Sequence, residues 1–221
     1  MSTYVLMRIL ESAPRRYDLG IRLLTFGSLD KAYDRLATRV EEGQRVLDVG
    51  CGTGALTMRA ARRGARVKGI DVNAQMLEIA RQRAGASGLA DNVDLQQMGI
   101  AELDAELPGS YDLVMSGLCF SELSEDEIAY GLGQIVRVLK PGGLLLVADE
   151  VKPPDLARRL LHALIKAPFA ALTYLVSQQT THAVEDLAGK LSKAGFSIES
   201  VRRNAFGSFV EIVARKRAQG T

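Results

Sequence analysis

The segment VLDVGCGTG (46–54) combines an apolar run, an aspartate and three glycines in a spacing that suits ligand binding. Asp48 lies within the run, and Gly50, Gly52 and Gly54 follow it. Glycine adopts backbone angles closed to other residues and leaves space where a Cβ would collide with a ligand. A helix that begins after such a turn offers unpaired N–H groups to a carboxylate or a phosphate. The segment therefore predicts a binding loop for a ligand that carries one of these anionic groups.

A second acidic residue, Asp71, ends the next apolar run, RVKGID (66–71). Gly50, Gly52 and Ala55 satisfy the G-x-G-x-x-G/A pattern of dinucleotide-binding loops, and Asp71 lies at about the ~20-residue distance at which an acidic residue grips ribose hydroxyls. The same loop suits the methionine part of S-adenosylmethionine. Spacing alone therefore leaves NAD and S-adenosylmethionine as alternative cofactors.

These residues are positioned by alternating strand-like and helical segments, which predict βαβ units and a parallel sheet. A helical pattern at 29–40 precedes them, and helices at 155–177 and 183–194 and a terminal hairpin within 196–217 follow. The predicted strands are 45–50, 66–71, 93–98, 111–117 and 142–150, and the helices between them are 54–63, 73–84 and 125–139.

VLDVGCGTG followed by GIDVNAQMLEIA (69–80) resembles the first two motifs of the class I S-adenosylmethionine-dependent methyltransferases. Further similar stretches follow in that family's order: 98–102, YDLVMSG (111–117), RVLKPGGLLLV (137–147) and LSKAGFSIESV (191–201). The resemblance implies an α/β Rossmann-like fold, with a mostly parallel seven-stranded sheet whose last strand is antiparallel. It also implies S-adenosylmethionine as methyl donor and S-adenosylhomocysteine as product.

Carried over by position, the resemblance assigns Asp48 and the glycines to the methionine end, Asp71 to the ribose, and Val72 and Met76 to the adenine. Many relatives carry an aspartate where this chain has Ile100, so here the backbone of Ile100 and Ala101 is expected to bond the adenine edge. The full expected set of cofactor contacts is Tyr17, Asp48, Gly50, Cys51, Gly52, Gly54, Asp71, Val72, Met76, Gly99, Ile100, Ala101 and Ser116.

RRYDLGIRLLTFG (15–27) is similar to the N-terminal motif of the quinone-biosynthesis C-methyltransferases. In that motif a tyrosine-aspartate pair stands at the start of a lid over the cofactor. This similarity places Tyr17 at the cofactor. A narrower resemblance, to corrinoid protein-associated methyltransferases of the same group, involves 116–127, 144–153 and 180–187. It implies a corrinoid protein as a partner.

The resemblance and the element pattern predict one methyltransferase domain over 1–221. Within it we expect an N-terminal helical lid (1–43), a cofactor-binding core (44–150), a helical insertion or lid (151–182) and a C-terminal helix and hairpin (183–221). A formal charge of +2 does not suggest a nucleic-acid partner. Two cysteines without a metal-ligand interval predict no metal site, and with no secretory signal at the N-terminus they favour a cytoplasmic protein.

A sulfonium methyl group is already activated, so catalysis needs alignment of donor and acceptor and exclusion of water. A small-molecule acceptor that reacts through oxygen or carbon needs a base, for which Tyr17, Glu122 and His182 are candidates. The apolar segment 156–176 is a core helix, a lid or a peripheral membrane contact. Two other functions stay open: a non-catalytic S-adenosylmethionine-binding partner of a corrinoid protein, and an NAD-dependent oxidoreductase.

Overall fold

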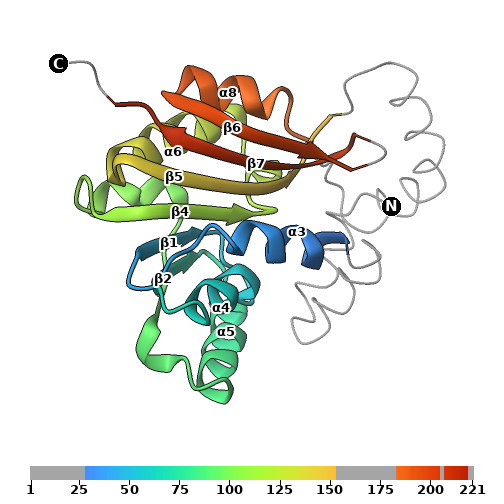
Figure 1. The fold of residues 1–221 in the computed structure, drawn as a ribbon. Helices are drawn as coiled ribbons and strands as arrows, with labels where there is room; N and C mark the ends of the chain where they lie inside the picture. Colours follow the sequence, from blue (N-terminus) through green and yellow to red (C-terminus); the bar gives the residue numbers. More distant parts are fainter. Residues whose placement is uncertain (1–27, 153–182, 205–206, 219–221) are drawn as a thin grey trace.

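The computed structural model describes residues 28–152, 183–204 and 207–218, whose strands form a single sheet (Figure 1). The strand order is β3-β2-β1-β4-β5-β7-β6. β7 is antiparallel to both of its neighbours, and the other neighbouring pairs are parallel, as expected. The strands are β1 (Arg45–Val49), β2 (Arg66–Asp71), β3 (Val93–Gln97), β4 (Tyr111–Gly117), β5 (Leu139–Glu150), β6 (Phe196–Arg203) and β7 (Phe209–Lys216).

Helices cover both faces of the sheet, because parallel strands joined by helical crossovers are buried on both sides. One face carries α3 (Ser28–Ala37), α4 (Ala55–Ala61) and α5 (Ala74–Ala86). The other face carries the 3-10 helix η2 (Ile100–Ala105) and the helices α6 (Glu125–Val138) and α8 (Leu187–Lys193). Two short 3-10 turns complete the described elements: η1 (Ala90–Asn92) and η3 (Phe120–Glu122).

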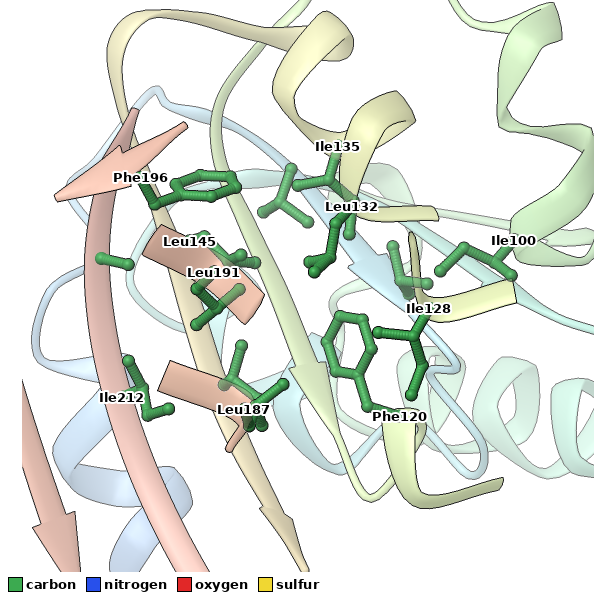
Figure 2. Close-up of a cluster of buried hydrophobic side chains, with 14 of the residues drawn as sticks. Ile100, Phe120, Ile128, Leu132, Ile135, Leu145, Leu187, Leu191, Phe196 and Ile212 are labelled. Atoms are coloured by element: carbon green, nitrogen blue, oxygen red, sulfur yellow. The ribbon is translucent and has the colours of Figure 1, made fainter. Parts of the chain in front are cut away.

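Each face of the sheet has its own apolar core. On the α6 and α8 face, Phe120, Leu132 and Phe196 are fully buried and pack together with strand residues (Figure 2). On the α3 and α4 face, Tyr33 and Leu36 of α3 pack against α4 and the sheet. The carboxyl ends of β1, β2 and β4 therefore lie between two fixed layers, which can hold a site at that edge steady.

Two elements begin three or more residues away from the sequence-based expectation. β5 begins at Leu139 instead of residue 142, because Leu139 already pairs with Tyr111 and the ladder continues past a register shift. α8 begins at Leu187 instead of residue 183, because Val184 forms a parallel bridge with Val151. Asp186 then caps the helix, and its side chain accepts the Gly189 N–H at 3.1 Å.

The predicted helix at 29–40 is present as α3, although it ends three residues early. Tyr17, His182 and the predicted helix 155–177, with its apolar part 156–176, lie outside the described residues. Across the described ranges, the helices are too short or too polar to span a bilayer.

Candidate functional site

The loop after β1 has left-handed backbone angles, which favour glycine, at Gly50, Gly52 and Gly54. Gly50 has φ +68°, and a Cβ there would lie 2.6 Å from the Cys119 Sγ, so the loop and the segment after β4 touch. Gly52 has φ +53°, and the space that its Cβ would fill is open. The Cys51 N–H donates to the Ile70 carbonyl at 2.9 Å, which ties the loop to β2. The expected glycine loop is thus a fixed backbone surface facing open space.

Asp71, at the end of β2, lies beside that loop. Its Oδ2 accepts the Gly52 N–H and its Oδ1 accepts the Asn73 N–H, both at 2.8 Å. A carboxylate has about four acceptor positions, so both oxygens keep capacity for further donors such as ribose hydroxyls. Burial raises the pKa of Asp71, while the N–H groups of Asn73 and Gly52 act in the opposite direction.

Two cavities meet over the glycine loop and share Gly50, Gly52, Gly117 and Leu118. The smaller, of about 210 Å³, runs along the ends of β2 and β4 and over the start of η2. The larger, of about 490 Å³, extends over α4 toward α3 and the end of α5. Together they can hold an extended ligand, with one end at Asp71 and the other over the start of α4.

The smaller cavity has an apolar wall at the predicted adenine position. Asn73 caps α5, accepting the N–H groups of Gln75 at 3.0 Å and Met76 at 3.2 Å, which places Met76 in the wall. Val72 is 70% exposed, unusual for a valine at a strand end, and its side chain borders the same cavity. These two side chains provide the surface on which a flat base can pack.

Ile100 also borders this cavity, but its side chain turns into the core. A Cβ on Gly131 of α6 would lie 2.3 Å from the Ile100 Cδ1, and Figure 2 shows Ile100 beside Ile128. The Gly99 N–H is taken by Glu102 at 2.7 Å. Ala101 is exposed and does not line either cavity. The backbone at the start of η2 therefore faces the predicted adenine position, and the side chain at position 100 is apolar.

Two other predicted contacts, Asp48 and Ser116, lie beneath the loop, outside both cavity walls. Asp48 is 1% exposed; its Oδ2 accepts the Thr57 hydroxyl at 2.6 Å, which joins β1 to α4. Its Oδ1 has no hydrogen-bond partner. Burial raises the pKa of Asp48 to about 7, against the opposing hydrogen bond from Thr57. The Ser116 hydroxyl donates to the Val49 carbonyl at 3.0 Å and braces β4 against β1.

The segment after β4 supplies further wall residues, and Glu122 is the one among them that the sequence predicts as a site residue. Leu118, Cys119, Glu122 and Leu123 all line the smaller cavity. Burial raises the pKa of the Cys119 thiol well above its ordinary value, so this side chain acts as a small apolar group. Ligands of open parallel sheets bind at the carboxyl ends of the strands. The position directly after strand 111–117 was therefore a usable signal for these residues.

One wall of the larger cavity is formed by α3, which belongs to the predicted N-terminal lid. Tyr33 of α3 packs on Gly117, where a Cβ would lie 2.3 Å from the tyrosine oxygen. Arg59 of α4 donates to Asp34 at 2.7 Å and to Asp30 at 2.9 Å, which fixes α3 on α4. This part of the expected lid, residues 28–37, is a fixed wall of the site.

Comparisons with known proteins agree with this geometry. A model of the methyltransferase domain family matches residues 46–143. The demethylmenaquinone methyltransferase of Thermus thermophilus is 36% identical over 210 residues, which cover 85% of this chain and 90% of that protein. The ubiquinone biosynthesis O-methyltransferase of Xanthomonas euvesicatoria is 34% identical over 174 residues, covering 75% of this chain and 68% of that protein.

A solved structure, the S-adenosylmethionine-dependent methyltransferase of Methanosarcina mazei, superposes with a TM-score of 0.66. It is 20% identical and covers 84% of this chain and 98% of its own. At that identity the likeness bears on the fold, and it confirms the expected Rossmann-like methyltransferase architecture. The names of these three relatives do not mention a corrinoid protein, so the expectation of that partner has no support from them.

Proposed function

The chain belongs to the class I S-adenosylmethionine-dependent methyltransferases, and on that premise we propose that it methylates a ring carbon of a small, demethylmenaquinone-like quinol. S-adenosylmethionine is its methyl donor. The similarity to the Thermus thermophilus demethylmenaquinone methyltransferase, which extends over most of both chains, is the observation that carries the choice of acceptor.

The described residues fit the donor. The open space at Gly52 lets the methionine part lie on the loop backbone. Asp71 keeps acceptor capacity for ribose hydroxyls, and Val72 and Met76 offer an apolar surface for adenine. Burial raises the pKa of Asp48 to about 7, and a cationic donor above the loop favours its ionised form, whose charge would in turn attract the ammonium and sulfonium groups. When bound, S-adenosylmethionine supplies the activated methyl group.

Glu122 is our candidate base for the acceptor, and Tyr17 and His182 stay predictions outside the described residues. A quinol becomes a stronger carbon nucleophile when one of its hydroxyl groups loses a proton, and a positioned carboxylate can take that proton. Glu122 lines the smaller cavity together with Leu118, Leu123 and Met98, which form an apolar boundary for an aromatic ring. The smaller cavity therefore combines a candidate general base, an apolar wall and part of the donor site.

The proposal is tested with a naphthoquinol that carries a short isoprenyl chain and a deuteron on the unsubstituted ring carbon, kept reduced under nitrogen. Methylation at carbon replaces the deuteron, so mass spectrometry should show a product that has gained CH₃ and lost deuterium. A product that keeps the deuterium would overturn the proposal in favour of methylation at oxygen, the second candidate, which the similarity to the Xanthomonas O-methyltransferase supports. Absence of any methylated product would reject this acceptor class.

A variant of the base separates catalysis from binding. Glu122→Gln should lower kcat by about 100-fold, the lower end of the usual range for general bases, while S-adenosylhomocysteine affinity changes less than twofold. Unchanged kcat would remove Glu122 as the base. Calorimetric titration of the wild-type protein with S-adenosylhomocysteine and NAD in parallel checks the remaining alternative, because NAD binding alone would contradict the donor assignment.

Corrinoid association and peripheral membrane contact through 156–176 remain sequence-based proposals. The first is tested by co-purification with a corrinoid protein and the second by vesicle sedimentation with anionic lipid.

A further inference from the structure

A buried carboxylate that lines neither cavity lies just behind the site. Asp149, next to last in β5, is fully buried. Its Oδ2 accepts the Phe120 N–H at 2.7 Å, and its Oδ1 accepts the N–H groups of Ser121 at 3.3 Å and Glu150 at 2.7 Å. Two of these three donors belong to the segment after β4, which is about thirty positions earlier in the chain.

Such a group is costly to bury and needs a compensating set of bonds. An ionised carboxylate away from water is strongly unfavourable unless hydrogen bonds satisfy it. Burial raises the pKa of Asp149 to about 6, and the hydrogen bonds from Ser121, Glu150 and Phe120 act against that rise. An apolar side chain could fill the same space without this cost, so the directional bonds are the property that distinguishes aspartate here.

Those bonds end on the segment that closes the smaller cavity, residues 118–122, which we name the β4 loop. Leu118 has φ +56°, a conformation rare and strained for a residue other than glycine, asparagine or aspartate. Its N–H donates to the Ala148 carbonyl at 2.9 Å, beside Asp149. Cys119 fills the space above Gly50, and Glu122 lines the cavity. The β4 loop therefore keeps its shape through contacts with the end of β5.

The apolar core anchors the same loop in a different way. The Phe120 side chain is fully buried and packs with Ile128 of α6 (Figure 2). Packing of this kind holds a side chain in place but is not directional, whereas hydrogen bonds to two successive N–H groups fix the orientation of the peptide planes. Phe120 sets where the β4 loop sits, and the carboxylate sets how its backbone is turned.

We propose that Asp149 is a positioning residue: its carboxylate holds the β4 loop against the glycine loop and so shapes the wall of the S-adenosylmethionine site. The inference rests on the donor site and not on the identity of the acceptor. It is tested by donor-side binding, so its failure and the failure of the quinol proposal are distinguishable.

The experiment compares Asp149→Asn with a matched control, Asp112→Asn. Asp112 also accepts a backbone N–H from another strand, that of Arg45 at 2.9 Å, but it lies at the opposite end of the sheet. Asparagine presents N–H groups where Asp149 accepts them, so at least one loop donor loses its acceptor. We expect Asp149→Asn to weaken S-adenosylhomocysteine binding about tenfold, the consequence of one unmet buried hydrogen bond, while Asp112→Asn stays within twofold.

Amide hydrogen exchange supplies a local readout that a general loss of stability would not give. In Asp149→Asn the Phe120 and Ser121 amides should exchange faster, while amides in β1 and β2 keep the protection they have in the wild type. Wild-type affinity, or an equal loss of protection across the sheet, would overturn the proposal. If Asp149→Asn does not fold, Asp149→Glu, which keeps the charge and moves the carboxylate by one methylene, decides it by the same two measurements.

Discussion

Carboxylates at the two edges of the sheet are satisfied in different ways. At the carboxyl edge, Asp48, Asp71 and Asp149 accept hydrogen bonds from backbone N–H groups or a hydroxyl. Within the described ranges, no lysine or arginine forms a salt bridge with any of these three. Burial raises the pKa of all three.

At the amino edge the carboxylates are neutralised. The Glu106 carboxylate lies 2.5 Å from the Lys68 Nζ and accepts the Tyr111 hydroxyl at 2.6 Å. Asp112 lies 2.5 Å from the Lys140 Nζ. Burial opposes ionisation of Glu106 and Asp112, but their hydrogen-bonded partners outweigh it and lower the pKa of both. The amino-edge carboxylates are balanced by lysines, whereas the carboxyl-edge aspartates have no salt bridge within the described ranges, so a bound cationic donor would favour their ionised forms.

The largest predicted effect concerns Asp48 and the pH dependence of stability. Its folded pKa of about 7 exceeds the unfolded value of 3.8, so the folded state holds a proton that the unfolded state has lost. Stability attributable to Asp48 is therefore highest at low pH and falls as pH rises from 4 to 7. At 1.36 kcal/mol per pKa unit the total is about 4 kcal/mol.

Urea unfolding of wild type and Asp48→Asn from pH 4 to pH 8 measures this difference. The free energy of unfolding of the wild type minus that of the variant should fall with rising pH and level off above pH 7. Asp149 titrates in both proteins, so its contribution cancels. A constant difference would show that folded Asp48 stays charged throughout this pH range, and would break the contrast between the two edges at one of its buried aspartates.

The second effect is on donor affinity. Asp71→Ala should weaken S-adenosylhomocysteine binding by ~1.5–3 kcal/mol, because hydroxyl groups of the ribose would lose their charged acceptor. Calorimetry gives the dissociation constant directly, and Asp112→Ala is the matched control from the amino edge. Equal affinities of wild type and Asp71→Ala would exclude Asp71 from the site.

The smallest effect belongs to the amino edge. Glu106→Gln should lower the free energy of unfolding by less than about 1 kcal/mol at neutral pH, as is usual for ion pairs near the surface. Because its folded pKa is lowered, the stability that Glu106 contributes is present above the unfolded pKa and is lost as pH falls through the folded value. Its kcat and donor affinity should match those of the wild type; a loss of turnover would mean that the amino edge also supports the site.

The sequence predicted the parts of this molecule that local pattern determines. Alternating apolar runs located the five parallel strands, and the glycine spacing with Asp71 located the donor loop. It could not show that Ile100 turns toward Gly131, since that contact joins two helices that only the folded chain brings together. Asp149 illustrates the same limit: the N–H groups of Phe120 and Ser121 are about thirty positions earlier in the sequence and reach its carboxylate only once the end of β5 lies beside the β4 loop.

The antiparallel β7 also has a consequence for aggregation. It pairs with β5 from Leu144 to Glu150 and with β6 on its other side, so the hairpin covers what would otherwise be an unpaired edge of β5. That edge is long and rich in leucine and valine, the kind of strand that pairs with other chains when exposed. A chain whose hairpin has not docked would therefore present a template for self-association, and the terminal strands protect solubility as well as completing the sheet.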